Sequence, residues 1–153
     1  MLYYLDTSAL VKRYVREAGS TWMLTLCASS PVHVFAVSLI TKVELIAGLA
    51  AKQRNDNLSL AGFYAVELDI ANDFLLQYQT VIINQATIDF AADLAKRQYL
   101  RGYDAVQLAC ALTLNTSLTM TSLPALIFVS ADTRLLQAAT REGLTTDNPN
   151  QHA

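Results

Sequence analysis

Short apolar runs alternate with segments of helical spacing along this chain. The runs are rich in β-branched and aromatic residues, which is typical of strands, and they cover residues 2–5, 32–37, 80–83, 125–129 and 144–146. Between them, apolar residues three or four positions apart predict helices over residues 9–14, 20–28, 38–51, 60–79, 85–100, 103–114 and 132–142. Strands that alternate with helices predict a three-layer α/β domain with a mainly parallel central sheet.

The first predicted strand, Leu2 to Leu5, ends abruptly at Asp6. Thr7 and Ser8 follow, and the first helical segment begins after them. Ligands of parallel α/β sheets bind outside the carboxyl ends of the strands, so Asp6 lies where a site is expected. Asp is also a favoured residue at the N-cap of a helix, and this stretch alone leaves both roles open.

Three more carboxylates share the features of Asp6. Most of the 13 Asp and Glu residues lie on helix faces that are expected to be solvated. Four are instead embedded among apolar or small residues near the start of a predicted helix: Asp6, Glu44, Asp104 and Asp132. Helix capping is an alternative role for each of them, with N-caps at Asp6 and Asp132, a capping box at Thr41–Glu44, and a favourable first-turn acid at Asp104.

The four acids are nevertheless expected to converge. Asp6 and Asp132 both follow strands, so a parallel sheet brings them to one edge, where the helices after its strands also begin. Ionised carboxylates that are buried close together repel one another, so they need a nearby cation to balance their charge. No Lys or Arg is evident among the four acids in the sequence. An all-oxygen, carboxylate-rich site suits Mg²⁺ or Mn²⁺. Such ions activate water and stabilise displacement at a phosphodiester.

Composition narrows the class of protein. A chain of 153 residues fits one domain, and 53% hydrophobic residues exclude a largely disordered chain. The net charge of −2 and the pI of about 5.6 are unlike a non-specific nucleic-acid binder. Any contact with nucleic acid therefore has to be local, metal-assisted or supported by a partner. With only two His and two Cys in the chain, a zinc site is disfavoured, and Cys27 and Cys110 are expected to be buried thiols.

The stretch from Ala105 to Ala131 carries no charge, which raises the question of a membrane span. Polar residues interrupt it throughout, and a span needs about 20 predominantly apolar residues. It is therefore expected to be a core helix, a polar loop at Asn115 to Pro124 and a buried strand. Met1 leads directly into the first strand without a basic region or cleavage site, so the expected location is the cytoplasm, with no membrane partner.

Four segments of the chain resemble the successive motifs of PIN-domain proteins, in particular of VapC-like toxins. They are, in chain order, YLDTSALVKRY, SLITKVELIAG, RGYDAVQLACAL and FVSADTRLLQAATREGL. An acid stands at the expected place in each, and the resemblance extends from Leu2 to about Pro149. It implies a PIN-like α/β/α nuclease domain over residues 1–149 with a polar tail at residues 150–153. It also implies a Mg²⁺- or Mn²⁺-dependent endoribonuclease that acts as the toxin of a type II toxin–antitoxin system.

The resemblance assigns roles to side chains of this chain. The acidic, catalytic metal site would be made of Asp6, Glu44, Asp104 and Asp132. The hydroxyl of Thr7 or Ser8 would be an auxiliary ligand or orienting group, with a plain helix-start hydroxyl as the alternative. Two arginines, Arg101 and Arg134, could hold phosphate, although a solvated or ion-paired arginine is the plainer interpretation.

The resemblance further implies partners: an RNA substrate, a cognate VapB-like antitoxin whose tail blocks the acidic cleft, and a second copy of the chain in a homodimer. The predicted loop Asn115 to Pro124 is longer than in compact members of the family. Lys12, Arg13 and Arg16 form a small basic cluster that could touch RNA or a partner, with a solvated face as the default expectation.

Two other functions fit the same residues. One is a PIN nuclease that acts on DNA or in RNA processing without an antitoxin. The other is a non-catalytic binding or scaffold domain in which the acids are only helix caps. Asn also caps helices well, so Asp-to-Asn substitution separates the capping role from the metal role.

Overall fold

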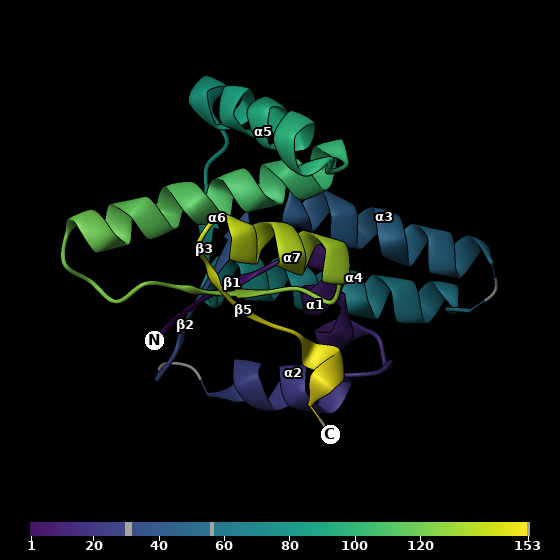
Figure 1. Ribbon diagram of the computed structural model, residues 1–153. Coiled ribbons are helices and arrows are strands. Elements are labelled where there is room, and N and C mark those ends of the chain that lie inside the picture. Colours follow the sequence, from purple (N-terminus) through teal and green to yellow (C-terminus); the bar gives the residue numbers. More distant parts are fainter. Residues whose placement is uncertain (30–31, 56, 153) are drawn as a thin grey trace.

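A five-stranded parallel sheet with helices on both faces forms the body of the molecule (Figure 1). The computed structural model describes residues 1–29, 32–55 and 57–152. The strands are β1 (Leu2–Leu5), β2 (Val34–Ser38), β3 (Tyr78–Val81), β4 (Ile127–Val129) and β5 (Thr145–Asp147). Their order across the sheet is β3-β2-β1-β4-β5, and each neighbouring pair is parallel. This arrangement confirms the predicted three-layer α/β/α class.

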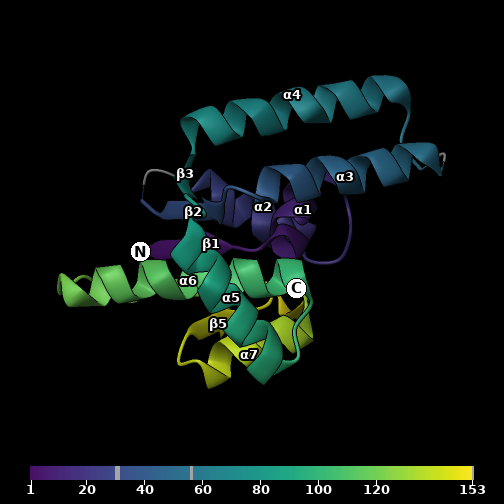
Figure 2. The same ribbon diagram turned by 90° about the horizontal axis from the view of Figure 1, so that it is seen from above.

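The helices divide between the two faces of the sheet, as the view from above shows (Figure 2). They are α1 (Thr7–Tyr14), α2 (Ser20–Ala28), α3 (Thr41–Arg54), α4 (Leu60–Leu76), α5 (Gln85–Gln98), α6 (Gly102–Met120) and α7 (Thr133–Arg141). The last three share one hydrophobic core, to which Tyr4 of β1 contributes. Leu5 belongs to the core shared by α1 to α4. Successive residues of a strand point to opposite faces, so β1 supplies both cores.

Most predicted elements are present, with shifted ends. The helix predicted to reach Gln79 stops at Leu76. The next residues form β3, because Tyr78 pairs with Phe35 of β2. The strand predicted over residues 32–37 occupies Val34–Ser38 instead.

The prediction of a polar loop over Asn115 to Pro124 was wrong for residues 115–120, and only residues 121–124 lie outside regular structure. Helix α6 continues to Met120 and extends beyond the sheet (Figure 1). The hydroxyls of its last turns donate to backbone carbonyls three or four residues earlier, for example from Thr116 to Leu112 (2.9 Å) and from Ser117 to Thr113 (3.0 Å). These polar side chains are therefore satisfied within the helix, which a reading of polarity alone does not anticipate.

The polar end of the chain packs against the body through His152. A 3₁₀ turn over Pro149–Gln151 precedes His152. The His152 ring stacks on Trp22 of α2 with ring centroids 4.2 Å apart. Its Nε2 lies 2.7 Å from Asp147 Oδ1. The boundary proposed at residue 149 stays a prediction.

Both cysteines are buried free thiols, in α2 and α6, as the sequence predicted. Among the residues that the structure describes, no helix combines the length and the apolar character needed to cross a membrane.

Candidate active site

The carboxyl ends of β1 and β4 meet at one edge of the sheet. Leu5 pairs with Val129, and the backbone N–H of Asp6 donates to the Val129 carbonyl at 2.9 Å. Asp6 and Ser130 therefore leave the sheet side by side. Asp132 follows two residues later, so the topology brings these two acids together as expected.

All four predicted acids line one open cleft of about 330 Å³ at this edge. The lining residues are Asp6, Thr7, Ser8, Val11, Glu44, Leu45, Gly48, Asp104 and Asp132. Both hydroxyl residues singled out in the sequence are among them, while Arg101 and Arg134 are not. The acids come from four motifs spread over most of the chain, so the fold itself creates this concentration of negative charge.

Asp6 is the most buried of the four, with 4% of its surface exposed. Its Oδ2 accepts three hydrogen bonds, from the Ser8 backbone N–H (3.1 Å), the Ser8 hydroxyl (2.5 Å) and the Ser130 hydroxyl (3.0 Å). Burial raises the pKa of Asp6 to about 6, although these hydrogen bonds oppose the rise. The described residues offer Oδ1 no hydrogen bond. Asp6 thus caps α1 with one oxygen and presents the other to the cleft.

Glu44 does not form the predicted capping box. Ile40 occupies the N-cap of α3 without a side-chain hydrogen bond, and Thr41 is already helical. Glu44 Oε2 instead accepts from the Thr7 hydroxyl (2.5 Å) and from Gln107 Nε2 (2.6 Å). The reason is the connection after β2, which is so short that α3 begins at Thr41 itself.

The sequence did not single out Gln107, which lies three residues after Asp104 on α6. Its side chain is 1% exposed. Its Nε2 also lies 3.0 Å from the hydroxyls of Thr7 and Thr41, so its two N–H groups are shared among these and Glu44. The sequence did contain a signal for this residue. Gln107 is the one amide in the nearly all-apolar segment 103–114, and a buried amide needs hydrogen-bond partners.

Asp132 and Asp104 occupy the starts of two helices. Asp132 Oδ1 caps α7 by accepting from the backbone N–H groups of Arg134 (2.8 Å) and Leu135 (3.1 Å). Asp104 lies in the first turn of α6, where burial and then the negative charge of Asp132 raise its pKa. The caps predicted at Asp6 and Asp132 are therefore confirmed.

As expected, no Lys or Arg that the structure describes lines the cleft among the acids, but two arginines act on the acids from outside its lining. The positive charges of Arg101 and Arg134 lower the pKa of Asp104 and so offset part of its rise. Arg134 also donates from Nη2 to the Tyr99 carbonyl, which anchors its side chain beside the cleft. Both arginines therefore lie near enough to act on the charge of Asp104, although neither lines the cleft.

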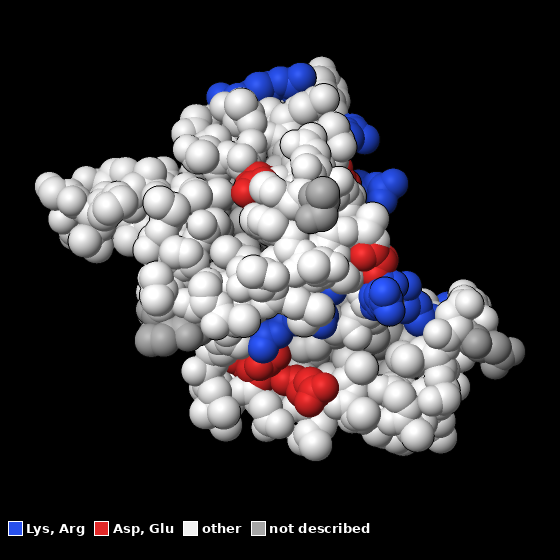
Figure 3. Space-filling model, turned by 90° about the horizontal axis from the view of Figure 1, so that it is seen from below, with Lys and Arg blue, Asp and Glu red and all other residues white. Residues whose placement is uncertain are grey.

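In the basic cluster, Lys12 and Arg13 are held in ion pairs, whereas Arg16 is exposed as the default expectation had it. Lys12 is buried and its Nζ lies 3.0 Å from Glu17 Oε1. Arg13 Nη2 lies 2.8 Å from Asp73 Oδ1, so Asp73 is not freely solvated either. On the face drawn in Figure 3, basic and acidic side chains are interspersed. This pattern agrees with the near-neutral composition and offers no broad basic surface.

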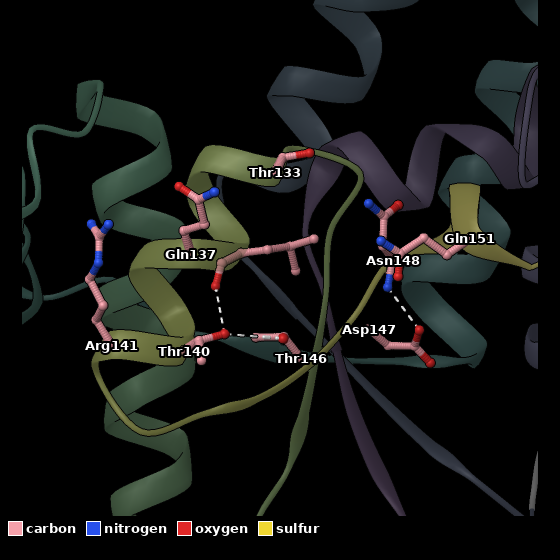
Figure 4. Close-up of a pocket in the computed structure, with 9 residues that line it drawn as sticks. Thr133, Gln137, Thr140, Arg141, Thr146, Asp147, Asn148 and Gln151 are labelled. Atoms are coloured by element: carbon pink, nitrogen blue, oxygen red, sulfur yellow. Dashed lines mark hydrogen bonds between the residues drawn. The ribbon is translucent and has the colours of Figure 1, made fainter.

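A second, larger pocket of about 440 Å³ lies between α7, β5 and the 3₁₀ turn (Figure 4), and none of the four acids lines it. Two of its side chains contact each other, with 3.2 Å between the Thr140 and Thr146 hydroxyls. Asp147 is the only carboxylate among its lining residues. The cleft is therefore the better candidate for a metal site.

The donor set of the cleft fits Mg²⁺ or Mn²⁺ in chemistry, because its polar side chains supply oxygen alone. Within residues 1–29, 32–55 and 57–152, no three carboxylate, imidazole or thiol side chains are already gathered tightly enough to enclose an ion. Mg²⁺ usually keeps several waters and takes one or two carboxylates. The cleft therefore suits a partly hydrated ion rather than a fully protein-enclosed one.

Comparison with known proteins agrees with the fold and the motifs. The PIN-domain family model matches residues 3–140. Ribonuclease VapC45 of Mycobacterium tuberculosis is 32% identical over 142 residues, which cover 93% of this chain and 92% of that protein. The range matched by the family model contains all four acids.

Two solved structures share the fold at lower identity. FitAcB from Neisseria gonorrhoeae has a TM-score of 0.67 at 18% identity and covers 99% of this chain and 100% of its own. VapBC2 from Rickettsia felis, bound to a DNA fragment from their promoter, has a TM-score of 0.59 at 20% identity, with 97% and 98% covered. The chain therefore belongs to the PIN-domain family, within its VapC-like branch.

Proposed function

We propose that this protein is a Mg²⁺- or Mn²⁺-dependent endoribonuclease and the toxin of a VapBC-like pair. The observation that carries the proposal is the convergence of Asp6, Glu44, Asp104 and Asp132 on one cleft at the carboxyl edge of the sheet. The name of the 32%-identical relative, Ribonuclease VapC45, supports RNA as the substrate.

The side chains of the cleft have distinct parts in this reaction. Asp6, Glu44 and Asp104 would hold the principal ion, and Asp132 would complete the site or help to hold a second one. The bound ion would supply the Lewis acidity that activates a water molecule and stabilises charge on the phosphodiester. The Ser8 and Thr7 hydroxyls donate to Asp6 and Glu44, so they orient these acids.

Arg101 and Arg134 would bind the phosphate groups of the RNA. Their positive charge reaches Asp104, so a phosphate drawn to them would lie beside the acids. Arginine suits this role because its planar fork matches phosphate oxygens. Two local arginines also account for nucleic-acid binding by a chain whose net charge is −2.

An antitoxin would cover the apolar outer surface of α4. Of the 17 residues of this helix, all of them described, Ile70 alone is buried. Its exposed large side chains are Leu60, Tyr64, Leu68, Leu75 and Leu76. Exposed apolar patches of this kind mark protein interfaces. The similarity to the fold of VapBC2 from Rickettsia felis favours a VapB-like partner. A homodimer is proposed from family membership, and sedimentation equilibrium of the purified chain tests it.

The test combines calorimetric titration of Mg²⁺ and Mn²⁺ with cleavage of single-stranded RNA and of DNA of the same sequence. The wild type should bind metal and cut only RNA, leaving 5′-phosphate ends. Asp6→Asn and Asp104→Asn should lose binding and cleavage while staying folded, and the exposed Asp89→Asn should retain both. If the wild type cuts neither nucleic acid, and the cleft variants bind metal as the wild type does, the result would favour a scaffold protein whose acids are only helix caps. Cleavage of DNA would favour the alternative function, a PIN nuclease that acts on DNA without an antitoxin.

A further inference from the structure

The Gln107 side chain joins three elements around the cleft. Its Oε1 accepts from the Tyr4 hydroxyl of β1 at 2.9 Å. Its Nε2 lies within hydrogen-bond distance of Thr7 in α1 and of Thr41 and Glu44 in α3. Both polar atoms of the amide are satisfied, which a side chain that is 1% exposed requires.

The contact with Glu44 is the shortest of the three made by Nε2, at 2.6 Å compared with 3.0 Å to each threonine. A hydrogen bond to a carboxylate is shorter and stronger than one to a neutral oxygen. The Thr7 hydroxyl donates to the same Glu44 oxygen at 2.5 Å and accepts from Gln107. Gln107 therefore contacts Glu44 directly, and it also contacts the Thr7 hydroxyl, which is the second donor to Glu44.

The bonds from Gln107 and Thr7 all reach Oε2, and the described residues offer Glu44 Oε1 no hydrogen bond. Asp6 has the same arrangement, with Oδ2 held by Ser8 and Ser130 and Oδ1 left to the cleft. Glu44 is on a half-exposed position of α3, and without these donors its side chain has several rotamers available.

We propose that Gln107 is a positioning residue, which fixes Oε2 of Glu44 so that Oε1 is presented to the cation in the cleft. The inference rests on the proposed metal-dependent function. Partners that orient a metal ligand typically change metal affinity or activity by about 10- to 100-fold when they are removed. Gln107 would act in this way from the core, without touching the ion or the RNA.

Two variants separate positioning from packing. Gln107→Met keeps the length and apolar body of the side chain but removes the amide donor to Glu44, so that only the Thr7 hydroxyl still donates to Oε2. Tyr4→Phe removes the partner at the other end of the amide and leaves the donors of Nε2 in place. Both disturb the same buried network, so a purely structural role predicts similar effects in the two proteins.

The experiment is calorimetric titration of Mg²⁺ into each folded protein, together with crystal structures of the metal-free proteins. Gln107→Met should weaken Mg²⁺ binding at least about tenfold and release the Glu44 side chain from its single orientation. Tyr4→Phe should bind Mg²⁺ like the wild type, with Glu44 in place. An unmoved Glu44 or an unchanged Mg²⁺ affinity in Gln107→Met would overturn the inference.

The two proposals fail in different ways. If the wild type binds no Mg²⁺ and cuts no RNA, the proposed function falls. The crystal structures then still decide whether Gln107 orients Glu44: a Glu44 that moves in Gln107→Met supports the positioning role, and one that stays refutes it.

Discussion

Replacing Asp6 with Asn is expected to stabilise the metal-free protein at neutral pH and to remove its response to Mg²⁺. In the folded chain, burial raises the pKa of Asp6 from 3.8 to about 6. The ionised side chain, which predominates at neutral pH, therefore lowers the stability of the folded protein. Asn is neutral, has the same shape and still offers an oxygen to the Ser8 N–H as an N-cap.

The size of the effect follows from this shift. Two pKa units correspond to about 3 kcal/mol of free energy of unfolding. The hydrogen bonds from the Ser8 and Ser130 hydroxyls oppose the rise, so their preference for the carboxylate is already included in this shift. We expect a gain of up to about 3 kcal/mol, which for a chain of this size raises the melting temperature by up to about 12 °C.

The pH dependence identifies the cause. Between about pH 4 and about pH 6, the folded protein binds more protons at Asp6 than the unfolded chain does, so the wild type loses stability as the pH rises through this range. Above it, the loss is complete and constant. Asp6→Asn lacks this loss, so its advantage should grow from about pH 4 to about pH 7.

Urea unfolding in the presence of EDTA measures the free energy of unfolding at each pH. The exposed Asp89→Asn is the control and should follow the wild type throughout. The reasoning is refuted if Asp6→Asn is less stable than the wild type at neutral pH, or if the difference between them does not change with pH. Adding Mg²⁺ should then stabilise the wild type and leave Asp6→Asn unchanged.

Three further perturbations test other contacts. His152→Ala removes the ring stacked on Trp22, the only tryptophan, so its fluorescence spectrum should change and stability should fall by about 1 kcal/mol in thermal unfolding; an unchanged spectrum would contradict the stacking. Asp73→Ala leaves the half-buried Arg13 without its ion-pair partner, which should cost about 2–3 kcal/mol in urea unfolding; a cost near zero would show a solvated pair. Arg134→Gln should raise the KM for RNA several-fold and leave Mg²⁺ affinity within about twofold; an unchanged KM would exclude a phosphate contact.

The fold was largely predictable because its signals are local. Apolar runs and helical spacing are properties of neighbouring residues, and alternation of the two leaves few arrangements besides a parallel sheet between helices. The end of α6 was missed for a reason that is also local. Thr116 and Ser117 look like loop residues by polarity, yet their hydroxyls bond to the preceding turn, and composition does not reveal which of these two states prevails.

The candidate site was only half predictable. The acids were found because each interrupts an apolar stretch, and the sheet topology then places Asp6 and Asp132 at one edge. The role of Gln107 was not found, because its partners are up to 103 residues away in sequence. Their identity depends on how three elements pack, which spacing within one helix cannot show. The metal function of the acids stays a prediction.

Capping and metal binding do not compete for these acids, because a carboxylate has two oxygens. Asp6 caps α1 through Oδ2, and Asp132 caps α7 through Oδ1. In each case the described residues leave the other oxygen without a hydrogen bond. The cap fixes the side chain at the start of a helix that begins beside the cleft, and this fixes the direction of the free oxygen. The same sequence feature that supports the capping hypothesis therefore prepares an ordered ligand, so stability of an Asn variant alone does not argue against a metal role.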